Sequence, residues 1–155
     1  MGTRWLSLCI CIFLTRRRQC PTAERVHPVA SKEPREMKIL VIDDEPGIRC
    51  LIEHVMQVNG HQVLVATNGV SGMRLMRLER PDMVITDILM PDQDGLGIIR
   101  CIRQEYPAVK ILAISGAGAV GTLDLLVAAG RLGADATLAK PFLPEQLFES
   151  VNRLA

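Results

Sequence analysis

Between Lys38 and the end of the chain, short apolar runs alternate with amphipathic segments, and this alternation constrains the fold more than any other feature of the sequence. The short runs are rich in β-branched residues and end at polar or turn-forming residues, as buried strands do. In the segments between them, apolar residues recur at spacings of three and four, which predicts helices. The predicted strands cover residues 38–43, 62–66, 82–87, 109–114 and 135–139.

Each predicted strand is followed by a predicted helix. The first helix is expected to be capped by Asp44, to hold Pro46 in its first turn and to stop at Asn59 and Gly60. The other four cover residues 70–79, 96–105, 123–132 and 145–154. Strict alternation of this kind predicts an α/β fold with a parallel sheet covered on both faces. With five strands, the flavodoxin-like order 2-1-3-4-5 is expected, with a ligand site at the carboxyl ends of the strands.

Charged and polar residues follow the predicted strands at this edge of the sheet. They are Asp43, Asp44, Asp87, Ser115 and Lys140. Three carboxylates placed so close together repel one another unless a cation or a proton lies among them. Because the carboxylate ligands are all oxygens, the pattern favours Mg²⁺. Surrounded by Mg²⁺, an ammonium group and a hydroxyl, Asp87 is arranged to act as a nucleophile toward phosphorus.

The body of the chain, residues 37–155, resembles the receiver domain of bacterial two-component response regulators. The resemblance rests on four motifs: LVIDDEPGIR for the acidic pair, VITDILMPDQDGL around Asp87, ILAISG for the fourth strand and GADATLAKPF for the lysine. It implies that Asp87 accepts a phosphoryl group from the phosphohistidine of a histidine kinase. It also implies that Asp44, Asp87 and the backbone carbonyl of Leu89 ligate Mg²⁺, with Asp43 acting largely through water.

The resemblance assigns three further roles. It implies that Lys140 and Ser115 contact the phosphoryl group, that Ser115 and Thr137 occupy the switch positions, and that the peptide bond before Pro141 is cis, which an X-Pro bond permits. The family usually has Tyr or Phe at the position of Thr137. Because a threonine has no ring to swing between exposed and buried sites, the loop at residues 116–122 and the helix after it are expected to carry the signal instead.

A second departure from the family pattern concerns the lifetime of the phosphorylated state. Leu89 and Ala117 stand where the family tunes how readily water attacks the acyl phosphate. Neither side chain can hold a water molecule by hydrogen bonding. Slow autodephosphorylation is therefore predicted.

The first 36 residues differ in composition from the rest. They carry seven basic and three acidic residues, against eleven basic and fourteen acidic in residues 37–155. The apolar run at residues 6–14 is too short to span a bilayer, and the proline-containing stretch at residues 19–36 has the composition of an unstructured linker. Two interpretations stay open: a disordered or weakly membrane-seeking arm, or upstream sequence with translation beginning at Met37.

The cysteines and the net charge exclude several classes of function. The five cysteines form no CxxC pair and no cluster with histidine at metal-ligand spacing, so neither a disulfide framework nor a zinc site is predicted. Cys50 and Cys101 are expected to be buried free thiols. The mildly acidic body argues against a nucleic-acid surface, which requires clustered basic residues.

Two other functions compete with a receiver. Residues 116–121 fit the G-x-G-x-x-G pattern of nucleotide-binding loops, but Asp135 begins its strand rather than ending it, and too few residues follow for a dinucleotide fold. A phosphatase with an aspartyl-phosphate intermediate would need an acid two residues after Asp87, where this chain has Leu89. His54 and His61 fall away from the strand ends and are expected to be surface or packing residues.

Together these features predict a single-domain, cytoplasmic response regulator rather than a dedicated enzyme, because no output domain follows the last helix. Its expected partners are a sensor histidine kinase or a histidine phosphotransfer protein, and a downstream protein bound through the helix at 121–132, the strand at 135–139 and the last helix. No nucleic acid, no membrane span and a monomer or weak dimer are expected. A pseudo-receiver that acts by contact without phosphorylation is the alternative.

Overall fold

The computed structural model describes residues 36–91, 93–116 and 122–155. The interpretations of residues 1–35 and of the glycine-rich loop beyond Gly116 lie outside these ranges. Within them, no helix combines the length and the apolar content that a membrane span needs.

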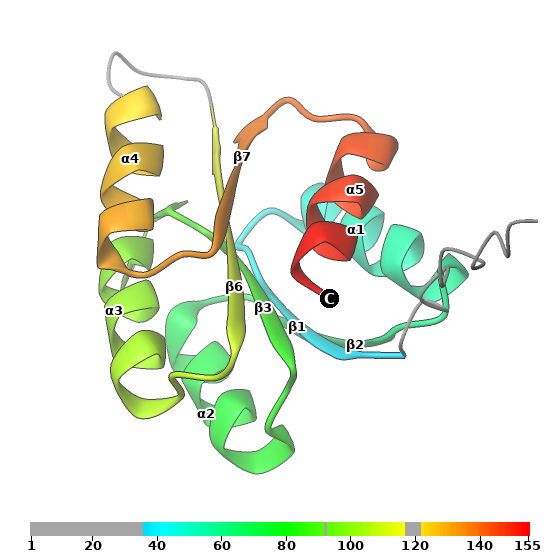
Figure 1. Cartoon of the computed structure of the whole chain (residues 1–155), viewed down its shortest axis with the longest axis horizontal. Coiled ribbons are helices and arrows are strands. Elements are labelled where there is room, and N and C mark those ends of the chain that lie inside the picture. The colour runs from blue at the N-terminus through cyan, green and yellow to red at the C-terminus, as the bar shows by residue number, and fades with distance from the viewer. Residues whose placement is uncertain (1–35, 92, 117–121) are drawn as a thin grey trace, which may run out of the picture. The chain divides into compact units, whose positions relative to one another are not determined.

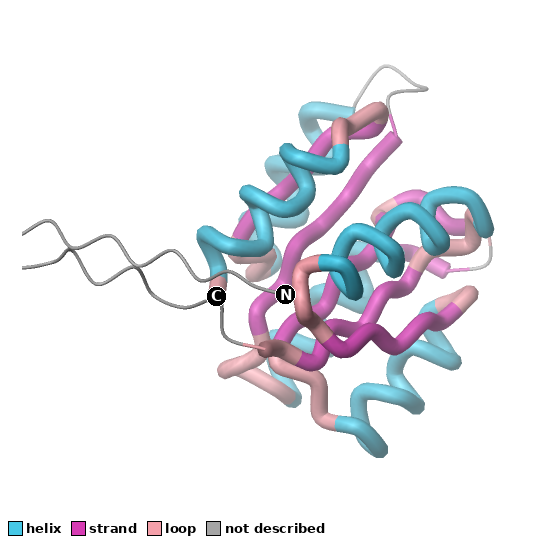
Figure 2. The backbone as a smooth tube through the Cα atoms, turned by 90° about the vertical axis from the view of Figure 1, so that its right-hand side faces the viewer, coloured by secondary structure: helices cyan, strands magenta, loops and turns pink. Residues whose placement is uncertain are grey.

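Five parallel strands form one sheet, as Figures 1 and 2 show. They are β1 (Lys38–Ile42), β2 (Gln62–Ala66), β3 (Met83–Asp87), β6 (Lys110–Gly116) and β7 (Ala136–Lys140). Their order is β2-β1-β3-β6-β7. Two short strands between β3 and β6, β4 (Leu89–Met90) and β5 (Gln93–Asp94), form a separate antiparallel pair. The predicted order 2-1-3-4-5 of the five main strands is therefore confirmed.

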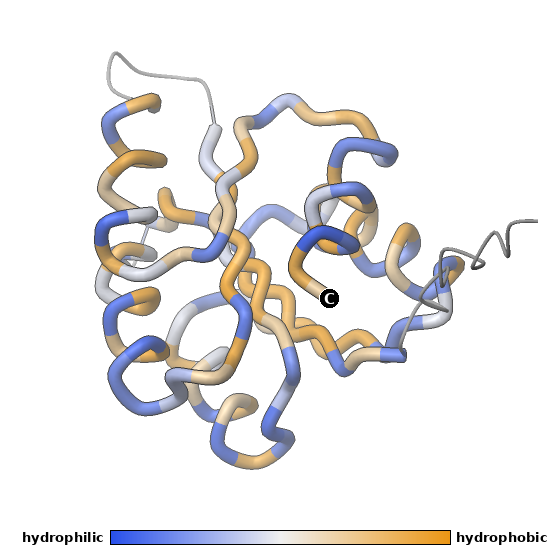
Figure 3. The backbone as a smooth tube through the Cα atoms, viewed as in Figure 1, coloured by the Kyte–Doolittle hydropathy of each residue, from blue (hydrophilic) through white to orange (hydrophobic). Residues whose placement is uncertain are grey.

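The helices cover both faces of the sheet (Figure 1). Helices α1 (Pro46–Val58) and α5 (Pro144–Leu154) pack on one face, and α2 (Gly69–Glu79), α3 (Gly95–Glu105) and α4 (Thr122–Leu132) pack on the other. Successive residues of a strand point to opposite faces. In β1, Ile39 and Val41 accordingly lie in the core beneath α1 and α5, whereas Leu40 and Ile42 lie in the core beneath α2, α3 and α4. The apolar strands that result are visible in Figure 3.

The structure corrects two predictions about α1 and α3. Asp44 does not cap α1: the helix begins at Pro46, and Glu45 occupies the N-cap position without a side-chain hydrogen bond. A proline in the first turn brings no amide hydrogen that needs a partner, so the helix can begin without a capping side chain. Cys50 and Cys101 are exposed rather than buried, because the inward faces of the two helices are filled by isoleucine, valine and methionine.

His61 is buried at the opposite edge of the sheet from the predicted site. Its Nδ1 atom accepts a hydrogen bond from the backbone amide of Met37 at 3.4 Å, and its Nε2 atom has no partner among the described residues. Burial lowers the pKa of His61 below its usual 6.5, against a smaller opposing effect of the Glu36 charge. The unfolded chain therefore takes up a proton more readily than the folded domain as the pH falls below 6.5.

We expect the free energy of unfolding to decrease as the pH falls below this value, by at most about 1.4 kcal/mol per pH unit, the linkage limit for one proton. Urea unfolding between neutral and mildly acidic pH measures the change. Replacing His61 with glutamine should flatten this part of the profile, whereas His54→Gln, at an exposed position, should leave it unchanged. An unaltered profile in His61→Gln would contradict the prediction.

Candidate functional site

All five predicted site residues lie at the carboxyl edge of the sheet because parallel strands end there together. Asp43 directly follows β1, and Asp87 is the last residue of β3. The register pairs Ser115 of β6 with Ala139 of β7, and Gly116 with Lys140. Each of these side chains therefore projects from the end of a strand that the core holds in place.

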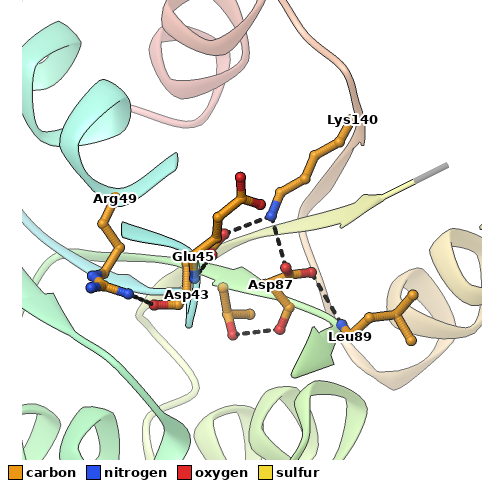
Figure 4. A network of polar contacts seen from close by, with 7 residues as sticks. Asp43, Glu45, Arg49, Asp87, Leu89 and Lys140 are labelled. Atoms are coloured by element: carbon orange, nitrogen blue, oxygen red, sulfur yellow. Dashed lines mark hydrogen bonds and ion pairs between the residues drawn. The ribbon is translucent and has the colours of Figure 1, made fainter. Parts of the chain in front are cut away.

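Lys140 joins the two buried carboxylates of the site, as Figure 4 shows. Its Nζ atom lies 2.8 Å from Oδ2 of Asp43 and 2.8 Å from Oδ2 of Asp87. The side chains are 13%, 2% and 7% exposed, respectively. One ammonium group therefore compensates two carboxylates in a place where solvent screens little.

Backbone amides hold the remaining carboxylate oxygens. Oδ1 of Asp43 accepts a hydrogen bond from the amide of Glu45 at 2.8 Å, and Oδ1 of Asp87 accepts one from the amide of Leu89 at 3.1 Å. The Arg49 guanidinium donates to the backbone carbonyl of Asp43 at 2.6 Å (Figure 4). These contacts fix both carboxylates in orientation before any ligand arrives.

Burial and pairing act in opposite directions on the pKa values of Asp43 and Lys140. Burial raises the pKa of Asp43 above its usual value, although the bonds from Lys140 and the Glu45 amide oppose the rise. For Lys140, burial alone would lower the pKa, but hydrogen bonds to Asp43 and Asp87 and their negative charges outweigh burial and raise it. The lysine is thus a firmly charged group at neutral pH.

Asp44 completes a group of three carboxylates with Asp43 and Asp87. One oxygen from each lies within 4.8 Å of the other two, and Asp44 is exposed to solvent. An open, all-oxygen site with one face toward water suits Mg²⁺, which keeps several water ligands. The donor set therefore fits the predicted ion.

Ser115 carries an unusual hydroxyl group. Its side chain is buried, yet its Oγ atom has no hydrogen-bond partner among the described residues. Buried polar atoms are almost always paired, so an unpaired one calls for an explanation such as a missing ligand. Since Ser115 lies on the strand beside Lys140, a ligand with oxygen acceptors at this edge would satisfy it.

Gly95, which the sequence interpretation did not single out, supports the segment after Asp87. Its amide donates to the carbonyl of Ile88 at 3.1 Å, and a Cβ atom at this position would collide with the backbone of Asp87 and Ile88. The helix that begins here is capped by Asp94, whose side chain accepts from the amide of Leu96 at 3.0 Å. The Asp-Gly pair before the third predicted helix was the available signal.

The remaining predicted positions lie on or near β7 and β6. Thr137 is exposed on β7, and the peptide bond between Lys140 and Pro141 is cis. Leu89 follows the nucleophile candidate in β4, with its side chain half-exposed. Ala117 lies outside the described residues.

Comparison with known proteins gives a consistent result. The sequence model of the family described as response regulator receiver domain matches residues 39–152. Sporulation initiation phosphotransferase F of Bacillus subtilis is 32% identical over 116 residues, which cover 75% of this chain and 91% of that protein. A probable transcriptional regulator ycf27 of Cyanophora paradoxa is 33% identical over 122 residues, but the chain spans only 49% of its length.

Solved structures show the same similarity. The receiver domain of NtrX from Brucella abortus superimposes with a TM-score of 0.70 at 30% identity, covering 75% of this chain and 96% of that one. The chemotaxis response regulator CheY4 of Vibrio cholerae gives a TM-score of 0.70 at 27% identity, covering 78% of this chain and all of the other. The longer NtrX chain is covered over only 27% of its length.

Proposed function

The chain belongs to the response regulator receiver domain family of two-component systems, and from this premise we propose that Asp87 accepts a phosphoryl group from a phosphohistidine. The donor would be a sensor histidine kinase or a histidine phosphotransfer protein in the cytoplasm. The observation that carries the proposal is the buried Asp87 carboxylate, held by Lys140 and the Leu89 amide beside two further aspartates.

The transfer needs one bond to form and one to break. An oxygen of Asp87 forms a bond to phosphorus, the phosphorus–nitrogen bond of the phosphohistidine breaks, and its electron pair stays on the imidazole nitrogen. The Lys140 ammonium, 2.8 Å from Asp87, lies where it can meet a phosphoryl oxygen. The Ser115 hydroxyl, which has no partner among the described residues, can donate to another. Both groups are in place before the reaction, so little reorganisation is needed.

Mg²⁺ would be held by Asp43, Asp44, Asp87 and the backbone carbonyl of Leu89, with Asp43 acting largely through water. When bound, the ion offsets the negative charge that gathers on the phosphoryl oxygens. Its three carboxylates lie close enough to share one ion.

Phosphorylation is proposed to act through contact with another protein. On α4, Leu123 and Val127 are 75% and 46% exposed, whereas Leu125 and Leu126 pack against the core. Part of the apolar surface of α4 is therefore exposed, on the helix that packs beside β7. Receiver domains are signalling modules, and the coverage of the B. subtilis phosphotransferase over 91% of its length supports a role in phosphoryl relay. Action as a stand-alone receiver stays a prediction.

Incubation with Mg²⁺ and acetyl phosphate tests the proposal. We expect intact mass to increase by one phosphoryl group in the wild type. No increase is expected in Asp87→Asn, because the nucleophile is lost, or with EDTA, because Mg²⁺ is removed. Asp124→Asn, at an exposed position on α4, is the matched control and should be labelled like the wild type. No labelling of the wild type would contradict the proposal and indicate a pseudo-receiver that signals by constitutive contact.

The phosphorylated protein is expected to lose its label slowly. The Leu89 side chain offers no hydrogen bond to a water molecule beside the acyl phosphate, and it is half-exposed next to Asp87. We expect Leu89→Asn to release phosphate several-fold faster than the wild type, since its amide can orient a water molecule. Phosphate release after removal of the donor measures both rates, and rapid loss from the wild type would refute slow autodephosphorylation.

A further inference from the structure

An open groove between α2 and α3 shares no residue with the aspartate site and has a volume of about 860 Å³. The two helices pack on the same face of the sheet (Figure 1). The α2 side is lined by Gly69, Val70, Met73, Arg74, Arg77 and Leu78, and the α3 side by Asp94, Gly97, Ile98, Arg100 and Cys101. None of these residues has a role in the proposed phosphoryl transfer.

The α2 side of the groove carries exposed apolar side chains, although α2 already has a separate buried face. Gly69, Gly72 and Met76 form the buried face of α2. Val70 and Leu78 lie outside that face and are 68% and 67% exposed. They are eight residues apart, or about 12 Å along a helix, which is the spacing of apolar anchors on an amphipathic partner helix of two to three turns.

The charged rim of the groove is strongly positive. Arg74, Arg77 and Arg100 are exposed, and none of them forms an ion pair or side-chain hydrogen bond with another residue in the described part of the chain. Among the described lining residues Asp94 is the one acid, and its side chain is engaged in capping α3. Arg74 and Arg77 are three residues apart on one helix, where like charges repel. An anionic partner would relieve that repulsion.

The three arginines also differ from their surroundings, since residues 37–155 carry more acidic than basic residues. We propose that the α2–α3 groove binds an acidic amphipathic polypeptide segment, with apolar side chains on Val70, Met73 and Leu78 and carboxylates on the arginines. Complementary charge of this kind sets specificity and association rate. The N-terminal segment of the chain is a poor occupant, because it is itself basic.

A nucleic acid is disfavoured as the occupant. Single strands bind grooves in which aromatic side chains stack on the bases, and no aromatic residue is among the described residues that line this groove. An open groove on a helix pair also differs from the enclosed pockets that bury most of a small ligand. A polypeptide helix is the occupant that matches both the apolar spacing and the charge.

Selection from a random peptide library tests the proposal on the full-length chain. Peptides of about 16 residues, roughly four helical turns, are selected on the wild type, with Arg74→Gln/Arg77→Gln/Arg100→Gln as counter-selection. We expect the recovered peptides to be net negative, with apolar residues at helical spacing. Their affinity, measured by fluorescence anisotropy, should fall about tenfold or more in the triple variant.

Two further variants show whether the groove itself is the site. Arg80→Gln/Lys110→Gln/Arg131→Gln removes the same charge at exposed positions outside the groove and should leave the affinity nearly unchanged. Gly97→Leu should block binding while the domain still folds, because a Cβ atom at Gly97 meets nothing closer than Oδ2 of Asp94 at 3.9 Å and leucine favours helix. Thermal unfolding by circular dichroism checks that each variant is folded.

The proposal would be overturned if the recovered peptides had no acidic bias, or if no arginine-dependent peptide were recovered. Binding that survives Gly97→Leu or the arginine triple variant would also overturn it. So would arginine-dependent binding of a single-stranded oligonucleotide of the same length. A concentration-dependent dimer that only the arginine triple variant abolishes, seen by sedimentation velocity, would also overturn it in favour of a second copy as the occupant.

Discussion

Replacing Gly95 with alanine is expected to destabilise the domain by about 3 kcal/mol and to slow phosphorylation, because there is no room for a Cβ atom. The atom would lie 2.6 Å from Cα of Ile88 and 2.8 Å from its carbonyl oxygen, and it would also collide with the Asp87 carbonyl. These are backbone atoms, which cannot move aside as a flexible side chain can. The backbone at Asp87 and Ile88 would have to move to make room, and this movement would displace the segment that holds the Asp87 carboxylate.

Gly97→Ala, two residues further along the same helix, is the matched control. A Cβ atom there would make only ordinary van der Waals contact, with Oδ2 of Asp94 at 3.9 Å, so the substitution should stabilise the helix by roughly 0.5–1 kcal/mol. Urea unfolding gives both values, and the initial rate of labelling by acetyl phosphate gives the effect on the site. Equal stability of the two variants would show that the segment after Asp87 tolerates displacement.

Replacing Lys140 with methionine is expected to cost about 3 kcal/mol in the absence of Mg²⁺, because breaking a buried ion pair leaves uncompensated charge. Asp43 and Asp87 would then face each other with no cation between them, at 2% and 7% exposure. Excess MgCl₂ should recover much of the loss, since the ion would supply the missing positive charge. The recovery separates an electrostatic effect from a packing defect.

Lys38→Met serves as the control for this substitution. Lys38 pairs with Glu79 at 3.1 Å, but the two side chains are 33% and 43% exposed, and surface ion pairs contribute at most about 1 kcal/mol. Its small loss should not respond to MgCl₂. If Lys140→Met were as stable as Lys38→Met, or if Mg²⁺ had no effect on it, the lysine would not be the charge partner of the two aspartates.

Much of the fold could be predicted because local patterns decide it. The β-branched run of β1 is buried on both faces, and the helical spacing of Ile52, Val55 and Met56 places them in the core. The strand ends followed from the same pattern, so Asp43, Asp87 and Lys140 could be expected at one edge. In the structure the Lys140 ammonium lies 2.8 Å from both carboxylates, so the three side chains do converge. The contacts themselves depend on how the elements pack, which the strand pattern does not describe.

The features that sequence patterns did not reveal depend on contacts between distant atoms. The β4–β5 pair is too short for a periodic signal. Gly95 is informative only once the backbone of Asp87 is known to lie against it. The burial of Cys50 and Cys101 was predicted from residue type alone. Both cysteines are exposed because isoleucine and methionine occupy the inward faces of their helices. Arg49 contacts Asp43 through a backbone carbonyl, which no spacing rule describes.

Lys140 ends β7, and in the part of the chain that the structure describes β7 pairs with β6 alone. A strand with one neighbour resists displacement with one hydrogen-bond ladder rather than two. The cation of the site therefore lies at the end of one of the two edge strands of the sheet, whereas the two carboxylates it contacts lie at the ends of strands flanked on both sides. Any ligand that pulls on the ammonium group would thus move the edge of the sheet before its centre, and the domain would deform on the side where Thr137 and α4 meet the solvent.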